Sequence, residues 1–318
     1  MALDILCIVL GIVMILKGAD TMVDGAKGLA RRFRVGEVVI GLTVVAFGTS
    51  LPELVVSLFS ALKGNGDMSA GNVVGSNIFN TLAILGATAI VTTVPVGRRA
   101  LFVDIPLSLF SALAFIVLCY DVFLWGSDAN QLSRIDGALL LLAFGAFMGY
   151  SFWLARRKVE ADSFVEDKQG LLLILLKIVL GIALVVFGGN ILVDSASSVA
   201  REFGVSEAVI GLTLLAAGTS LPELATSAVA ARKGSVGMAV GNVIGSNVFN
   251  VFLVLGSSSL IRPMQIAGIR GLDVAFLLGS SLVVLLLAVV FRQLTRWMGI
   301  ALVLSYIAYL VMLVLAQV

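Results

Sequence analysis

The seven residues GTSLPEL occur twice in this chain, at 48–54 and at 218–224, and both copies interrupt strongly apolar stretches. In the first copy, Pro52 has no backbone N–H, so the carbonyl of Gly48 loses its helical hydrogen-bond partner. Gly48 itself weakens the helix further. At bilayer depth, such a break is tolerated only where it is buried in protein or lines a watery cavity. The motif therefore predicts a broken helix at an internal site, provided that the chain crosses a membrane.

The composition indicates a membrane protein. The chain has 318 residues, of which 60% are hydrophobic and only 13% are charged, and its mean hydropathy is +1.12. A soluble domain needs more charge to cover its surface. A helix needs about 20 apolar residues to cross a bilayer, so we predict an all-α polytopic membrane protein with ten transmembrane helices. Their expected ranges are 3–23, 37–62, 69–93, 101–120, 135–155, 170–193, 207–231, 238–261, 272–291 and 297–316.

The chain contains an internal repeat, whose two copies are 170 residues apart. The offset places GNVVGSNIFN (71–80) on GNVIGSNVFN (241–250), and 29 of 51 positions are identical between 36–86 and 206–256. Such identity at a fixed spacing indicates duplicated structural units. We therefore expect two five-helix halves, with an odd number of spans that gives them inverted topology. The expected parts are 1–155 with its most repeated segment at about 37–93, a polar linker at 156–170, and 171–318 with its most repeated segment at about 207–261.

The basic residues of the expected loops favour one orientation, if Lys17 and Lys177 within or near spans are left aside. One side has 14 of them, and the other side has five. The richer side carries Lys27, Arg31, Arg32, Arg34, Arg98, Arg99, Arg156, Arg157, Lys158, Lys168, Arg232, Lys233, Arg292 and Arg296; the poorer side carries Lys63, Arg134, Arg201, Arg262 and Arg270. Because basic loops stay in the cytoplasm, we expect a multi-pass protein of the cell (inner) membrane with both termini extracytoplasmic and the linker cytoplasmic.

The residues around each break are rich in oxygen. Thr49 and Ser50 lie four and three positions before Glu53, so they share its face wherever helix persists. Ser76 and Asn80 are likewise four apart. The second half repeats this pattern with Thr219, Ser220, Glu223, Ser246 and Asn250. Oxygen ligands without histidine or cysteine suit hard cations such as Na⁺ and Ca²⁺, and the chain has no histidine. We expect the two half-sites to form one cage with two carboxylates.

The paired motifs resemble the α-repeats of the sodium/calcium exchanger (cation/Ca²⁺ antiporter) superfamily, and most of all its compact prokaryotic members. The resemblance covers essentially the whole chain and implies a ten-helix inverted-repeat transporter. It implies central Ca²⁺-binding carboxylates at Glu53 and Glu223 and a midplane polar pair at Asn80 and Asn250. The Na⁺ ligands that it implies are Thr49, Ser50, Ser76, Thr219, Ser220 and Ser246, with the backbone carbonyls of Ala46 and Ala216. Some members carry an aspartate at the position of Asn250, so the ion stoichiometry stays open.

The predicted function is secondary antiport of Na⁺ for Ca²⁺ by alternating access. The alternatives are a Ca²⁺/H⁺ antiporter, with Glu53 and Glu223 carrying the protons, and, less favoured, a passive cation channel. The sequence has no GxxxxGK[ST] motif, so direct ATP drive is not expected. We expect no enzyme activity, no cofactor, and no nucleotide or nucleic acid partner. The expected partners are Ca²⁺ and Na⁺ as substrates and the lipid bilayer; the oligomeric state is left open, a monomer included.

The orientation can be tested with single cysteines in a background that lacks Cys7 and Cys119. An impermeant thiol reagent added to intact cells is expected to leave Ser163→Cys unlabelled, because the 156–170 linker is predicted to be cytoplasmic. The same reagent should label Asn65→Cys, which lies in a loop on the opposite side. Labelling of Ser163→Cys from outside intact cells would contradict the predicted orientation.

Overall fold

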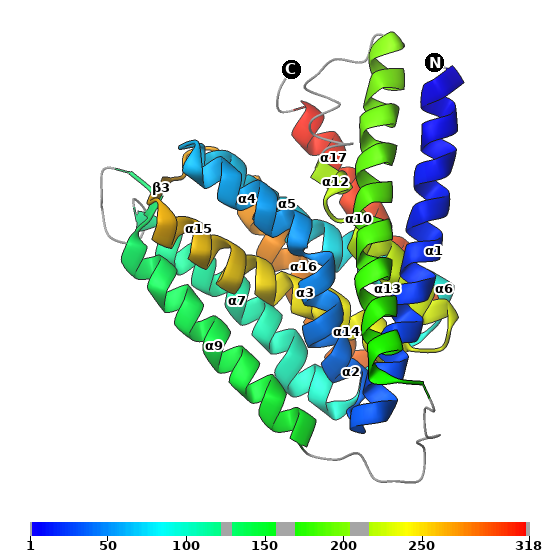
Figure 1. The fold of residues 1–318 in the computed structure, drawn as a ribbon. Coiled ribbons are helices and arrows are strands. Elements are labelled where there is room, and N and C mark those ends of the chain that lie inside the picture. The colour runs from blue at the N-terminus through cyan, green and yellow to red at the C-terminus, as the bar shows by residue number, and fades with distance from the viewer. Residues whose placement is uncertain (1, 122–128, 157–168, 204–215, 316–318) are drawn as a thin grey trace.

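The protein is described here by a computed structural model that covers residues 2–121, 129–156, 169–203 and 216–315, and these ranges are almost entirely helical (Figure 1). The helices of the first half are α1 (Ala2–Phe33), α2 (Glu37–Ile40), α3 (Ala46–Thr49), α4 (Leu51–Leu62), α5 (Gly66–Phe79), α6 (Leu85–Val91), α7 (Ile105–Cys119) and α9 (Arg134–Arg156). Those of the second half are α10 (Leu171–Glu202), α12 (Ala216–Gly218), α13 (Leu221–Arg232), α14 (Val236–Phe249), α15 (Gly256–Ile261), α16 (Gly271–Phe291) and α17 (Arg296–Leu315).

The described helices fit a polytopic membrane protein. Eight of them are long and apolar enough to cross a membrane, when continuous α and π segments are counted together. A ninth candidate consists of the segments Glu37–Thr49 and Leu51–Leu62, which are bent by 47° at their junction. The expected span at 207–231 falls partly on residues 207–215, which lie outside the described residues. The class of fold is confirmed, and the count of ten helices stays a prediction.

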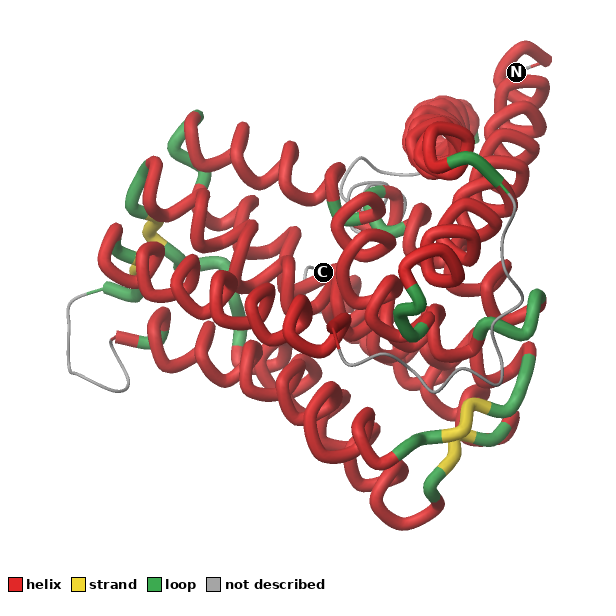
Figure 2. Tube along the Cα trace, turned by 60° about the horizontal axis from the view of Figure 1, so that its bottom comes forward, coloured by secondary structure: helices red, strands yellow, loops and turns green. Residues whose placement is uncertain are grey.

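Four two-residue strands depart from the all-α expectation. β1 (Val94–Pro95) pairs antiparallel with β4 (Gln293–Leu294), and β2 (Gln131–Leu132) pairs antiparallel with β3 (Met264–Gln265). Figure 2 shows the strands at two separate edges of the helical body. Each pair joins a connection of one half to a connection of the other. Backbone groups that leave a helix must find new partners, and these contacts satisfy some of them.

Turns of π-helix interrupt three spans, at η1 (Gly41–Val45), η2 (Asn80–Ile84) and η6 (Asn250–Leu255), and a further π segment, η3 (Ala100–Asp104), begins the span that continues as α7. α5 runs through Gly71 and Gly75 without a break. The geometry changes later, at Asn80 in the first half and at Asn250 in the second. Single π turns inside α-helices are frequent at functional sites.

The centre of the molecule is formed by two equivalent helices of the repeat. In the span Gly66–Val91, 83% of the most apolar 18-residue stretch is buried inside the protein, and in Val236–Ile261 the corresponding share is 89%. The values for the other single-helix spans lie between 17% and 39%. The same two spans carry the repeated GN…GSN segments. The polar motif is therefore placed where the protein, rather than lipid, surrounds it.

The helices α1 and α10 form a closely packed pair that runs in opposite directions (Figure 1). Each has 32 residues, so the basic residues from Lys27 to Arg32 lie within α1 and not in the loop that we expected. Ala, Leu, Lys and Arg are good helix formers, which explains why the helix continues. The pair meets through glycines. A Cβ atom on Gly18 would lie 2.8 Å from the carbonyl oxygen of Gly181, and one on Gly188 would lie 2.9 Å from that of Gly11.

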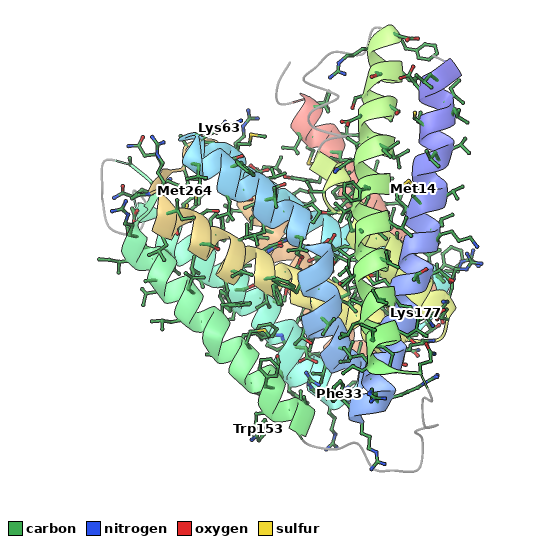
Figure 3. All side chains as sticks on the ribbon, in the orientation of Figure 1. Met14, Phe33, Lys63, Trp153, Lys177 and Met264 are labelled. Carbon is green, nitrogen blue, oxygen red and sulfur yellow. The ribbon has the colours of Figure 1, made fainter. Side chains whose placement is uncertain are left out.

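An ion pair fastens α1 to the end of α13. The Nζ atom of Lys233 lies 2.7 Å from the carboxylates of both Asp20 and Asp24. Burial lowers the pKa of Lys233, but the hydrogen bonds that its ammonium donates to these two carboxylates, together with their charge, outweigh burial, so that its pKa is raised overall. The residues that the repeat places at the equivalent positions of Lys233 and Asp24 are Lys63 and Asp194. These two make no ion pair within the described part of the chain, and Figure 3 shows Lys63 at the end of α4, away from α10.

The glycine contact predicts a position-specific loss of stability. Gly18→Ala is expected to lower the unfolding temperature of the purified protein, because the new Cβ would press on backbone atoms of α10, and overpacking of this kind costs about 1–3 kcal/mol. The control is Gly145→Ala in α9, since a Cβ there meets nothing within 4 Å among the described residues. Alanine favours a helix over glycine by about 1 kcal/mol, so the control should be neutral or stabilising. Equal effects of the two variants would contradict the packing.

Candidate ion site

Both copies of GTSLPEL break their helix at the serine. Ser50 lies between α3 and α4 with φ −84° and ψ 8°, and Ser220 lies between α12 and α13 with φ −93° and ψ 7°. The prolines fall in the first turn of the helices that follow, where a missing N–H has no helical partner to lose. The predicted breaks are therefore present. Each break places a glutamate in the first turn of a new helix.

The two glutamates are held by serines from the opposite half of the chain. Ser220 Oγ donates to Glu53 Oε1 at 2.9 Å, and Ser50 Oγ donates to Glu223 Oε1 at 2.9 Å. Both glutamates are completely buried. The contacts are reciprocal, so each broken helix supplies a carboxylate to the other and receives a hydroxyl from it. The two breaks therefore form one site.

The repeated GN…GSN segments complete this site. Ser76 Oγ donates to Glu53 Oε1 at 3.3 Å, and Ser246 Oγ makes the same contact with Glu223 at 3.3 Å. Asn80 and Asn250, at the start of the two π turns, are also completely buried. The sequence predicted that all of these residues line one cage. The hydrogen bonds join the two glutamates with the four serines, and Asn80 and Asn250 each follow one of these serines by four residues along the same span.

Four buried oxygen atoms of these residues have no hydrogen-bond partner in the described part of the chain. They are Oε2 of Glu53 and of Glu223, and Oδ1 of Asn80 and of Asn250. A buried acceptor left unpaired costs about 1–3 kcal/mol, and more if it is charged. All four are acceptors, and two of them belong to carboxylates. This donor set fits a hard cation such as Na⁺ or Ca²⁺.

The remaining predicted residues lie at the same two breaks. Thr49 Oγ1 donates to Asn242 Oδ1 at 3.1 Å, and Thr219 Oγ1 donates to Asn72 Oδ1 at 3.4 Å. The carbonyl oxygen of Ala46 accepts the Ser50 N–H at 3.0 Å and the Thr49 hydroxyl at 3.4 Å. The backbone of Ala216 begins α12, and its side chain is outside the described set.

Asn72 and Asn242, which the sequence did not assign to the site, hold the backbone of the two glutamates in place. Asn72 Nδ2 donates to Ser57 Oγ at 3.0 Å and to the carbonyl oxygen of Glu53 at 3.4 Å. Asn242 does the same with Ser227, at 3.0 Å, and with the carbonyl of Glu223, at 3.4 Å. They fix the backbone on which each glutamate stands. The sequence shows both asparagines at the same place in the repeat. It does not show their hydrogen-bond partners, because these lie on a different helix.

The two half-sites differ in their access. Thr49 and Asn242 are buried, whereas the equivalent Thr219 and Asn72 are half-buried and line a cavity of about 630 Å³. Asp194 of α10 lies on the wall of the same cavity. The cavity therefore reaches these residues from the end of the molecule at which, among the described residues, the Lys233 ion pair has no equivalent.

Fold and site together define a helical membrane protein with a buried cluster of oxygen atoms between two broken helices. The family model described as "Sodium/calcium exchanger protein" matches residues 3–153 and 173–315. The chain belongs to this family. The match confirms the resemblance drawn from the repeated motifs. Members of this family are transporters rather than catalytic enzymes.

Individual relatives agree with this assignment. The chain is 32% identical to the sodium/calcium exchanger MaX1 of Methanosarcina acetivorans, with 98% of each chain covered. It is 38% identical to the inner membrane protein YrbG of Escherichia coli over 81% of this chain and 80% of that protein. The solved structure of the sodium-calcium exchanger NCX_Mj soaked with 10 mM Na⁺ and zero Ca²⁺ superposes with a TM-score of 0.81 at 32% identity, covering 96% of this chain and 97% of that one.

The unpartnered oxygens predict that cations stabilise the fold. Ca²⁺ is expected to raise the unfolding temperature of the purified protein, and a ligand at 100 times its Kd contributes about 2.7 kcal/mol. Glu53→Gln should abolish most of this shift, because it removes one of the two buried negative charges. Glu37→Gln, at the start of α2 and outside the cage, is the matched control and should keep it. A full shift in Glu53→Gln would rule out this cage as the Ca²⁺ site.

Proposed function

We propose that the protein exchanges Na⁺ for Ca²⁺ across the membrane, with Glu53 and Glu223 as the central Ca²⁺ ligands. The observation that carries the proposal is the set of four buried oxygen acceptors, on Glu53, Glu223, Asn80 and Asn250, that have no hydrogen-bond partner in the described part of the chain. Ca²⁺ needs anionic oxygens to offset its dehydration, and the two glutamates supply them. The similarity to the exchangers MaX1 and NCX_Mj supports the same choice of ions.

The hydroxyls and carbonyls around the glutamates suit Na⁺. In this proposal the Na⁺ ligands are Thr49, Ser50, Ser76, Thr219, Ser220 and Ser246, with the carbonyls of Ala46 and Ala216. Two carboxylates supply a charge of about −2, which balances either one Ca²⁺ or two Na⁺. Competition for the same charge makes the two ions alternative occupants. Because Na⁺ and Ca²⁺ cannot occupy the cage together, the protein exchanges one ion for the other.

We propose two inverted repeats and alternating access as the mechanism. Three features support this: the opposite directions of α1 and α10, the reciprocal contacts Ser50–Glu223 and Ser220–Glu53, and the unequal burial of the equivalent half-sites. In the orientation that the loop charges predict, the cavity of about 630 Å³ faces outward and the Lys233 ion pair lies on the cytoplasmic side. In an inward-open state, the cavity at the outer end would then be closed, and the cytoplasmic end, where the Lys233 ion pair lies, would be open.

The test is uptake of ⁴⁵Ca²⁺ into proteoliposomes that contain the purified protein. An outward-directed Na⁺ gradient is expected to drive uptake, and a pH gradient without Na⁺ is expected to drive none. Glu53→Gln and Glu223→Gln should each abolish Na⁺-driven uptake while the protein still folds. Uptake driven by the pH gradient alone would indicate Ca²⁺/H⁺ antiport. Near-normal Na⁺-driven uptake in either glutamine variant would refute the ligand assignment.

A further arm of the same assay concerns K⁺. Asn250 offers an oxygen without a negative charge, so the cage has little electrostatic reason to bind K⁺ beside Ca²⁺. Replacement of K⁺ by choline on both sides is therefore expected to leave Na⁺-driven flux unchanged. Loss of flux that returns when K⁺ is added back at clamped voltage would contradict this interpretation of Asn250.

A further inference from the structure

We infer that Asn77 and Asn247 are positioning residues, which orient the amide groups of Asn250 and Asn80 so that their oxygens face the ions. The inference rests on the proposed function, since it concerns how the same cage is held ready for a cation. Both residues lie in the repeated GSN segments and are almost fully buried. Neither was assigned a part in binding from the sequence.

The contacts cross between the two halves. Asn80 Nδ2 donates to Asn247 Oδ1 at 3.1 Å, and Asn250 Nδ2 donates to Asn77 Oδ1 at 3.1 Å. Each of these NH₂ groups is therefore engaged away from the cage. The other end of each amide, Oδ1 of Asn80 and of Asn250, is one of the unpartnered acceptors described above.

The alternative amide orientation is unfavourable for two reasons. Rotation of the Asn80 amide by 180° would bring its oxygen against Asn247 Oδ1, where two acceptors repel each other. It would also place the NH₂ group, which has only donors, toward the cation. The same holds for Asn250 against Asn77. The crossing asparagines therefore select the orientation in which the amide acts as an oxygen ligand.

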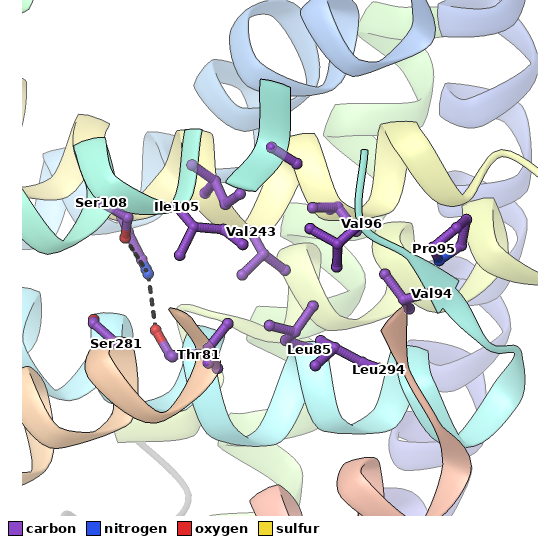
Figure 4. Close-up of a pocket in the computed structure, with 15 residues that line it drawn as sticks. Thr81, Leu85, Val94, Pro95, Val96, Ile105, Ser108, Val243, Ser281 and Leu294 are labelled. Carbon is purple, nitrogen blue, oxygen red and sulfur yellow. Dashed lines mark hydrogen bonds between the residues drawn. The ribbon is translucent and has the colours of Figure 1, made fainter. Parts of the chain in front are cut away.

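Asn247 is itself oriented by side chains. Its Nδ2 atom donates to Thr81 Oγ1 at 2.9 Å and to Ser108 Oγ at 3.3 Å, as the dashed lines in Figure 4 show. The Thr81 hydroxyl uses its proton to donate to the carbonyl oxygen of Asn77 at 2.8 Å, so its lone pairs are free to accept. With both donors of Asn247 directed this way, its Oδ1 is left to face Asn80.

Asn77 is oriented in a different way. The position that the repeat makes equivalent to Thr81 is Val251, which has no hydroxyl to accept a hydrogen bond. Instead, Asn77 Nδ2 donates to the backbone carbonyl of Asn247 at 3.2 Å. Side chains thus anchor the amide that orients Asn80, whereas the backbone anchors the amide that orients Asn250.

A double-mutant cycle tests the inference. Asn247→Ala is expected to raise the Kd for Ca²⁺ about tenfold, measured by calorimetry on purified protein, because the Asn80 amide loses its orientation. In an Asn80→Asp background the same change should have little effect, since both ends of a carboxylate are oxygens. In an Asn250→Asp background the tenfold effect should remain, because Asn247 does not orient residue 250. The alanine variant keeps the backbone carbonyl that anchors Asn77.

Thr81→Val supplies a second variant, in case Asn247→Ala does not fold. It removes the hydroxyl that Asn247 donates to, and it should weaken Ca²⁺ binding in the same direction, again without effect in the Asn80→Asp background. An equal loss with and without Asn80→Asp, or no loss at all, would overturn the inference in a protein that still binds Ca²⁺. A wild-type protein that binds no Ca²⁺ would overturn the proposed function and this inference with it.

Discussion

The rest of the structure depends on the burial of two carboxylates to which no basic residue of the described part of the chain is bonded. Transfer of an ionised carboxylate out of water is very costly unless it is paired and hydrogen-bonded. Here Glu53 and Glu223 each receive serine hydroxyls on one oxygen, while the other oxygen is unpartnered among the described residues. A cation is the natural complement of such an arrangement. Because each glutamate depends on a serine of the opposite half, the two halves form one site only when both are correctly packed.

The surroundings of the site follow from this requirement. A helix can be broken at membrane depth only where the break is buried in protein or lines a watery cavity, and the two most buried spans, Gly66–Val91 and Val236–Ile261, provide protein cover. Asn72 and Asn242 then bind the backbone carbonyls of the glutamates, and Asn77 and Asn247 link the two halves. The polar network is thus continuous from one break to the other.

Much of this could be predicted from the sequence, because it is a matter of local pattern and repetition. The breaks at GTSLPEL follow from the missing N–H of proline, and the equivalence of Glu53 with Glu223 follows from the 170-residue offset. Other features depend on contacts between distant segments. The π turns at Asn80 and Asn250, the ion pair of Lys233 with α1, and the partners of Asn247 have no signal in the spacing of apolar residues. The length of α1 was underestimated because charged residues were taken to end the span, although they are good helix formers.

Because α1 and α10 are longer than a bilayer is thick, the way they lie in the membrane depends on the thickness of the bilayer. A helix of 32 residues is about 48 Å long, whereas the hydrocarbon core of a bilayer is about 30 Å thick. The excess is met by tilt or by projection into the interface, and the balance between the two changes with the lipid. Since the glycine contacts hold the two helices together, both must respond to lipid thickness as one unit. Through Asp20 and Asp24, which bind Lys233 at the end of α13, that response reaches the helix that carries Glu223.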